Sequence, residues 1–170
     1  ALSLLGHLLN SALVYCVCIR LALAGRLEAG PVRFAALVAA LAFAVHPIRV
    51  EVVAWASAFP YVLSLGLTLV ALLAYLSYCA RASVAARRWW LGLSVFVYAL
   101  SLLSRVNAIG LPLVLLALDV YPLRRVAPQA RPGVSRNVTP APTLRTWGLL
   151  LVEKIPFLVV ALLAAVAESL

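Results

Sequence analysis

Long apolar stretches separated by short polar segments make up almost the whole chain. These stretches cover approximately residues 1–24, 34–45, 61–80, 89–104, 107–121 and 147–167. A helix needs about 20 residues to cross the hydrocarbon core of a bilayer. The first, third and sixth stretches therefore predict membrane-spanning helices, whereas the other three are short for that role.

The short stretches leave two arrangements open. The second stretch can be lengthened through Pro47 toward Ala58. The fourth and fifth are either two spans or one re-entrant hairpin broken at residues 104–107, because irregular backbone at membrane depth needs a cover of protein or water. The polar segment 122–146 is rich in Pro and Arg and predicts a flexible cytoplasmic linker.

Composition agrees with the pattern, since 66% of the residues are hydrophobic, only 11% are charged and the mean hydropathy is +1.11. A soluble domain of 170 residues would need a polar shell that 5 acidic and 14 basic residues cannot supply. We therefore predict an all-α, polytopic membrane helix bundle of about six transmembrane or re-entrant helices that forms one domain over residues 1–170. The chain has no methionine and opens inside an apolar stretch, so we expect it to be an internal piece of a longer protein.

The basic residues gather on alternate connections between the stretches. They are Arg20, Arg26 and Arg33 on the first connection, Arg81, Arg87 and Arg88 on the third, and Arg124, Arg125, Arg131, Arg136 and Arg145 on the fifth. The positive-inside rule places these connections in the cytoplasm. Residues 46–60 and Arg105 are then expected outside it, in a multi-pass protein of the bacterial inner membrane or the endoplasmic reticulum.

The net charge of +9 does not predict nucleic-acid binding. Topology accounts for the arginines, and no platform of aromatic and basic residues for stacking bases accompanies them. Membrane lipid with anionic headgroups is the simpler partner for such charge.

Several isolated polar residues predict packing rather than chemistry. His7 and Asn10 share a helical face and are expected to hydrogen-bond to a neighbouring span or to a domain outside this sequence. The cysteines lack the second ligand pair of a zinc site, so no metal site is predicted from them. They are Cys16, Cys18 and Cys79.

Three further charged residues lie within or beside the last two stretches. Asp119 is expected to pair with Arg124 or Arg125, or to cap a loop, and Glu153 to pair with the same basic connection. Lys154 is expected to extend its ammonium group back to the basic side. None of the three is predicted to be catalytic.

The densest polar group on the outer side comprises His46, Arg49 and Glu51 around Pro47. Pro47 suits the first turn of a helix, so "HPIRVEVVAWASA" predicts a short interfacial helix. Arg49 and Glu51 would then point to nearly opposite sides and need separate partners. Arg105 is one partner for Glu51, but both charges can equally lie solvated in the headgroup region, and the residues leave these alternatives open.

Three strings, in this order along the chain, resemble a known family: "HPIRVEVVAWAS", "LLSRVNAIGLPLVLLALDVYPLRR" and "LLVEKIPFLVVALLAAVA". They are similar to the multispanning part of the transmembrane and tetratricopeptide-repeat-containing O-mannosyltransferases and their bacterial homologues, in the GT-C glycosyltransferase superfamily. The resemblance implies transfer of a sugar from a polyprenyl-phosphate donor to a protein or other hydroxyl acceptor at the outer face. It also implies a catalytic carboxylate on a loop before Ala1 and tetratricopeptide repeats after residue 170.

Under this resemblance the donor phosphate and sugar would be bound by His46, Arg49, Glu51 and Arg105. Arginine suits a lipid phosphate because it is always charged and binds with two N–H groups. Glu51 would orient an arginine, contact the acceptor or bind a divalent cation. The chain departs from the family at residues 58–60, where a charged triplet is common, so the alternative is an inactive membrane anchor or scaffold for the repeats. The third alternative is a lipid or solute transporter, which would need polar groups along a path through the bilayer. The polar groups of this chain are instead expected at the two faces, and the span interiors are expected to be apolar.

Overall fold

The structure is a computed structural model that describes residues 2–48, 55, 58–126 and 144–169, and within them every regular element is a helix. The helices are α1 (Leu2–Ala24), α2 (Ala29–Val45), α4 (Phe59–Ala80), α5 (Val84–Ser104), the 3₁₀ helix η2 (Val106–Ala108), α6 (Leu111–Val120) and α7 (Leu144–Ser169). The predicted all-α class is therefore confirmed. The predicted interfacial helix falls largely on residues 49–57, most of which lie outside the described part.

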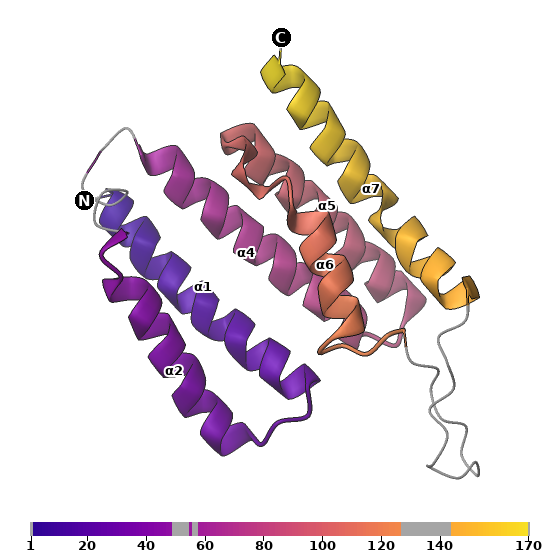
Figure 1. Ribbon diagram of the computed structural model, residues 1–170, viewed down its shortest axis with the longest axis horizontal. Helices are drawn as coiled ribbons and strands as arrows, with labels where there is room; N and C mark the ends of the chain where they lie inside the picture. The colour runs from indigo at the N-terminus through magenta and orange to yellow at the C-terminus, as the bar shows by residue number, and fades with distance from the viewer. Residues whose placement is uncertain (1, 49–54, 56–57, 127–143, 170) are drawn as a thin grey trace.

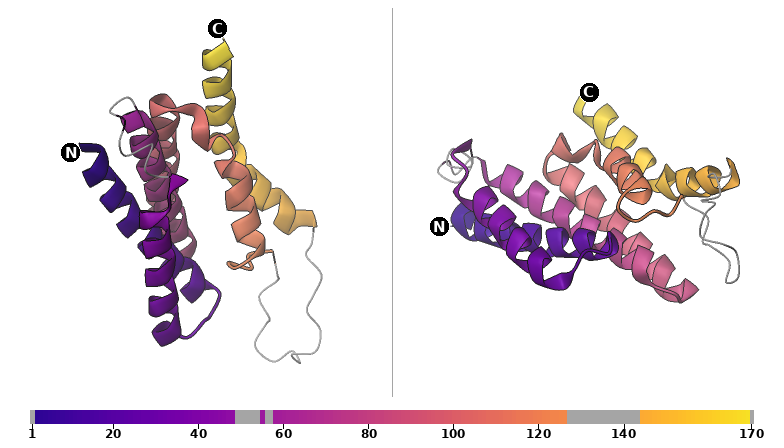
Figure 2. Two further views of the ribbon diagram at one scale, coloured as in Figure 1. Left: turned by 60° about the vertical axis from the view of Figure 1, so that its left-hand side comes forward. Right: turned by 60° about the horizontal axis from the view of Figure 1, so that its bottom comes forward.

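The helices form a bundle in which α1 packs against both α2 and α4, and α4 against α5. Figure 1 shows α2, α1, α4 and α5 following one another across the molecule, and Figure 2 shows α6 and α7 beyond the α4–α5 pair. The ends of α1, α4 and α6 and the starts of α2, α5 and α7 form what we call the arginine-rich end. The ends of α2 and α5 and the start of α4 form the opposite end, which we call the Arg105 end.

Three helices of the described chain are long and apolar enough to cross a membrane: Leu2–Ala24, Phe59–Ala80 and Trp147–Ser169. They correspond to the first, third and sixth apolar stretches. α2 has 17 residues and is apolar but short, while α5 has 21 residues but carries Arg87 and Arg88 in its first turns. Large apolar side chains on α1 and α7 face outward, as lipid contact requires; Leu8 is 55% exposed and Leu162 is 66% exposed.

The fifth apolar stretch is a broken segment. α6 has only 10 residues, and a turn and η2 separate it from the end of α5. The Tyr98 hydroxyl donates toward the carbonyl oxygens of Ala108 and Ile109, at 3.1 and 3.5 Å. This contact supplies a hydrogen-bond donor where the helical ladder is interrupted, which is the condition for irregular backbone inside a membrane protein.

Small residues let the helices approach closely. A Cβ atom on Gly6 would lie 2.8 Å from Val62 Cγ1, and one on Gly66 would lie 2.7 Å from Asn10 Oδ1, so α1 and α4 meet through these two glycines. Ser94 joins α5 to α4 by donating to the Ala71 carbonyl at 2.7 Å. Close contact at small residues is the usual basis of helix association where lipid competes for apolar surface.

An aromatic cluster fixes α7 against the α4–α5 pair. Tyr75, Tyr98 and Phe157 are all fully buried. The Phe157 ring lies 6.2 Å from the Tyr75 ring in an edge-to-face contact and 5.8 Å from the Tyr98 ring. Such ring pairs contribute about 0.5–1.5 kcal/mol each beyond the area they bury.

The Gly66 contact can be tested with two matched glycine substitutions. Gly66→Ala should destabilise the protein by roughly 1–3 kcal/mol, because Asn10 is nearly fully buried and cannot retreat while its amide binds the Val62 carbonyl. Gly92→Ala is the control, since no atom beyond its chain neighbours and its own helix backbone lies within 4 Å of the added Cβ. It should be neutral or stabilising by up to about 1 kcal/mol. Unfolding in detergent micelles measures both, and equal effects would contradict the close approach.

Candidate functional site

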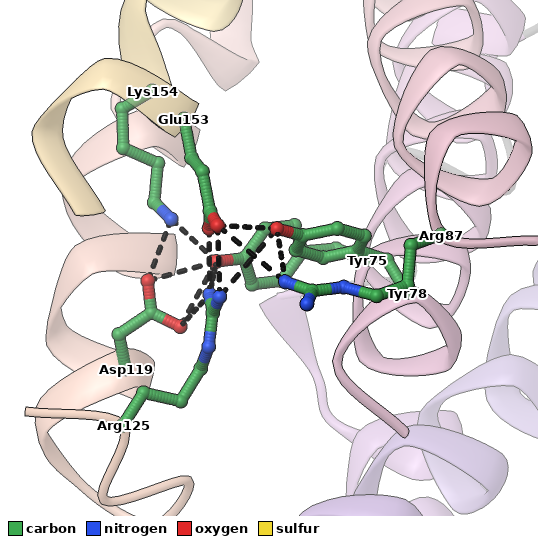
Figure 3. Close-up of polar contacts among 7 residues, drawn as sticks. All are labelled: Tyr75, Tyr78, Arg87, Asp119, Arg125, Glu153 and Lys154. Carbon is green, nitrogen blue, oxygen red and sulfur yellow. Dashed lines mark hydrogen bonds and ion pairs between the residues drawn. The ribbon is translucent and has the colours of Figure 1, made fainter. Parts of the chain in front are cut away.

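Polar side chains gather in two places within the bundle, one toward each end. The first group is an ionic cluster on the side of the arginine-rich end, formed by Tyr75, Tyr78, Arg87, Asp119, Arg125, Glu153 and Lys154 (Figure 3). The second is a polar pocket on the side of the Arg105 end, with a volume of about 250 Å³.

The buried centre of the ionic cluster joins three helices. Lys154 on α7 donates to Asp119 Oδ2 on α6 at 2.6 Å, and it also donates to the Tyr75 hydroxyl on α4. That hydroxyl lies 2.9 and 2.8 Å from the two Asp119 carboxylate oxygens. Asp119 and Lys154 are 0% and 2% exposed, so this ion pair has been removed from solvent almost completely.

Arg125 connects the centre of the cluster to its partly exposed side. Its Nη1 donates to Asp119 Oδ1 at 3.1 Å and to Glu153 Oε2 at 2.8 Å, and its Nη2 donates to Glu153 Oε1 at 3.0 Å. Tyr78 donates to Glu153 and accepts a hydrogen bond from Arg87 at 2.8 Å. Burial is the largest single influence on Arg125 and disfavours its charge, but the hydrogen bond with Glu153 and the electrostatic attraction of neighbouring groups together outweigh burial and raise the pKa of the guanidinium above its ordinary value.

Local backbone features bring these side chains together. Tyr75 and Tyr78 are three residues apart on α4, so both project from one face of that helix. Pro156 lies inside α7, where proline removes a backbone hydrogen bond, and Figure 2 shows the helix changing direction between its two halves. Beyond α6, the Arg125 N–H donates to the Asp119 carbonyl at 2.8 Å, which folds the guanidinium back onto the cluster.

The ionic cluster is satisfied by the protein's own groups. Across the described residues, every buried side-chain nitrogen or oxygen has a hydrogen-bond partner. A complete network of this kind fixes one arrangement of its helices, whereas a binding site keeps polar groups available for a ligand. We therefore assign the cluster a structural role, joining α6 and α7 to α4 and α5.

The cluster confirms some sequence predictions and corrects others. Asp119 pairs with Arg125, and Glu153 pairs with the same arginine, as predicted. Lys154 does not extend to the basic side: it is buried against Asp119. The prediction that the span interiors are apolar is wrong here, because a cation and an anion from separate apolar stretches pair inside the bundle. The opposite charges of Asp119 and Lys154 were the signal in the sequence from which this pair could have been predicted.

Removing one charge should show how much the buried pair contributes. Lys154→Met should destabilise the protein by roughly 3–5 kcal/mol, because Asp119 loses its shortest ionic partner in a buried setting. Ile155→Met is the control, since Ile155 is the next residue of α7 and is 51% exposed. Its effect should stay within about 0.5 kcal/mol.

A double substitution separates the pair from its surroundings. Lys154→Met combined with Asp119→Asn should be less destabilising than the sum of the single changes, because neither variant group then needs a charged partner. Denaturation in detergent micelles provides the free energies of unfolding. Strict additivity would show that the two side chains act independently.

The polar pocket lies among α1, α4 and the segment that contains η2. Its polar lining comes from His7, Asn10, Tyr61, Ser64, Thr68 and Asn107. Among the described residues the lining is rich in hydroxyl and amide groups and includes no carboxylate. Such a surface suits a neutral ligand that carries hydroxyl groups.

Helix-to-helix hydrogen bonds hold the walls of the polar pocket in place. His7 lies 3.0 Å from the Ala44 carbonyl of α2 through its Nε2 atom, and Asn10 donates to the Val62 carbonyl of α4 at 2.8 Å. The prediction that these two residues bind neighbouring helices is confirmed. Because α2 ends at Val45, the His7 contact also fixes the backbone directly before His46.

A hydroxyl network forms another wall between α4 and α5. Ser101 Oγ donates to the Ser64 carbonyl at 2.8 Å and lies 2.7 Å from Thr68 Oγ1. Ser64 Oγ in turn donates to the Arg105 carbonyl at 3.2 Å. The backbone of Arg105 is therefore tied to the wall of the pocket.

The Arg105 side chain lies over the Tyr61 ring, which lines the polar pocket. The guanidinium carbon is 4.2 Å from the ring centroid, and Nη2 donates to the Tyr61 hydroxyl. Within the described part of the chain Arg105 forms no ion pair with a carboxylate, and it is exposed. No described carboxylate therefore neutralises its charge beside the pocket.

The structure describes two of the four predicted donor-binding residues. His46 is exposed at the end of α2, where its Nδ1 accepts a hydrogen bond from the Ile48 N–H at 3.3 Å. It lies at the same end of the bundle as Arg105. Arg49 and Glu51 lie outside the described residues, so the predicted contact between Glu51 and Arg105 stays a prediction.

An apolar groove of about 280 Å³ runs beside the polar pocket, between α1 and α4. It shares Asn10 and Val62 with the pocket, and its lining includes Leu9, Phe59 and Leu63. Sequence reasoning missed both the groove and the pocket, because each depends on which faces of α1 and α4 meet.

No metal site accompanies these features in the part of the chain that the structure describes, where no group of three or more His, Cys, Asp or Glu side chains comes together. The cysteines are unpaired, and Cys79 packs against the apolar core as predicted. The possible cation ligand Glu51 lies among the residues that are not described.

No protein-family description, curated protein or solved structure matches this chain.

Proposed function

We propose that this chain is the membrane part of a glycosyltransferase-like protein that binds a polyprenyl-phosphate-linked sugar at the Arg105 end. The carrying observation is the adjacency of three chemically different surfaces: an exposed arginine, a neutral hydroxyl-rich pocket and an apolar groove. A lipid-linked sugar has three matching parts, namely a phosphate, a polyhydroxyl ring and a hydrocarbon chain.

Each surface supports one part of the assignment. Arg105 offers a fixed positive charge to the phosphate, since the Tyr61 contact orients its guanidinium. The polar pocket offers uncharged donors and acceptors to sugar hydroxyls. The apolar groove offers a lipid-facing surface to the start of the isoprenoid chain. The proposed transfer goes to a protein or other hydroxyl acceptor.

The proposed topology puts the Arg105 end outside the cytoplasm. The support is that the described arginines of the first, third and fifth connections collect at the opposite end, where the positive-inside rule expects them. In this arrangement α2, α5 and the η2–α6 segment also cross the membrane, together with the three longer helices. The catalytic carboxylate would come from a loop before Ala1.

Substituted cysteines test the topology. In a background with Ser at positions 16, 18 and 79, Asn107→Cys and Ser83→Cys place single thiols on exposed residues at opposite ends of the bundle. A membrane-impermeant maleimide added to intact cells should label only the first. Labelling of both from one side would contradict the alternation.

Arg105→Ala tests the donor site. In the full-length protein it should lower transfer from a radiolabelled polyprenyl-phosphate sugar by about 10- to 150-fold, because hydrogen bonds to charged groups contribute roughly 1.5–3 kcal/mol. Arg33→Ala is the matched control, since Arg33 is an exposed arginine at the arginine-rich end. Its activity should match that of the wild type. Equal activity of both variants would refute the phosphate role of Arg105.

The second candidate is a membrane anchor for a soluble repeat domain, without catalysis. The observation that favours it is Phe59, which is an apolar residue that lines the groove. In the family that the chain resembles, a charged residue is common at this position. This candidate predicts that the full-length protein transfers no sugar even when the donor is bound.

A further inference from the structure

A third cavity opens at the arginine-rich end, away from the polar pocket. It has a volume of about 380 Å³ and lies between the last turns of α1 and α4 and the segment after α6. Leu23, Leu76, Cys79 and Leu123 give it a largely apolar wall, and Arg20 is its charged lining residue. A single arginine beside an apolar wall presents an amphipathic surface.

The charge of Arg20 is not neutralised within the described residues. Arg20 is exposed and forms no ion pair with any described carboxylate. Asp119 and Glu153 are already bound by Arg125 and Lys154. The cavity therefore keeps a positive charge on its rim.

Further arginines reinforce this positive charge. A Cβ on Gly25, at the end of α1, would lie 3.5 Å from Pro122 Cβ, so the end of α1 contacts the segment after α6. Arg26 follows that glycine and Arg124 lies two residues after the proline, and both are exposed. Against them, the α1–α2 connection carries one exposed carboxylate, Glu28.

We propose that this cavity binds an anionic phospholipid, with the lipid phosphate on Arg20 and the acyl chains against Leu23, Leu76 and Leu123. The position supports a lipid rather than free phosphate, because the cavity lies at the ends of two membrane-length helices, where headgroups meet hydrocarbon. The apolar wall has the same implication, since inorganic phosphate gains nothing from leucine side chains. The site is separate from the donor site and does not depend on the proposed function.

Native mass spectrometry of the full-length protein released from mixed nanodiscs tests the site. With phosphatidylglycerol and phosphatidylcholine in equal amounts, the wild type should retain mainly phosphatidylglycerol. Arg20→Gln should lower the occupancy of the cavity by phosphatidylglycerol about fivefold, which is the effect expected for one arginine near a lipid surface. Arg33→Gln is the control, because Arg33 is exposed at the same end but does not line the cavity, and it should retain wild-type occupancy.

A second variant tests the apolar wall. Leu23→Trp should fill part of the cavity and lower the occupancy of both lipids, while the 46% exposure of Leu23 leaves room for the larger ring. Equal losses in Arg20→Gln and Arg33→Gln would overturn the proposal, as would equal retention of the two lipids by the wild type. Displacement of the lipid by millimolar inorganic phosphate would also overturn it, in favour of a phosphate-only site. Unchanged melting temperatures in detergent show that the variants remain folded.

Discussion

The buried ion pair between Asp119 and Lys154 is the constraint on which the rest of this bundle depends. Two charges removed from solvent incur a desolvation cost of several kcal/mol each unless geometry and further hydrogen bonds compensate. Tyr75 and Arg125 provide those bonds, so α4, α6 and α7 must meet at one point and in one register. The paired glycines and the serine contacts then bring α1 and α5 against α4 without needing charge.

This constraint reaches the opposite end of the molecule through a short path. α6 carries Asp119 near its last turn, and only a turn separates its first residue from η2. η2 contacts α4, α5 and α7, and Asn107 within it lines the polar pocket. The bonds to Asp119 therefore restrict the movement of Asn107 and Arg105. The polar pocket, which is partly built on irregular backbone, keeps one shape as a result. The proposed donor site thus depends on charges at a distance from it.

Sequence reasoning found what depends on local composition and period. It predicted the helical class and the three long spans. It also predicted that Asp119 would pair with an arginine and that His7 and Asn10 would bind neighbouring helices. It did not predict that Lys154 would be buried, because a lysine near the end of an apolar stretch is equally compatible with extension to the interface. It missed the polar pocket, the apolar groove and the third cavity because each is a space left between helices. Such a space depends on the sizes of side chains on two helices at once, as the contact between Gly66 and Asn10 illustrates.

Two cations share Asp119, and their distances along the chain differ greatly. Arg125 follows Asp119 by 6 residues and Lys154 follows it by 35. During synthesis Asp119 is therefore made well before α7, and Arg125 is the counter-charge available to it in the interval. The order of these residues gives the 10-residue helix α6 a local partner first and a second partner from α7 later.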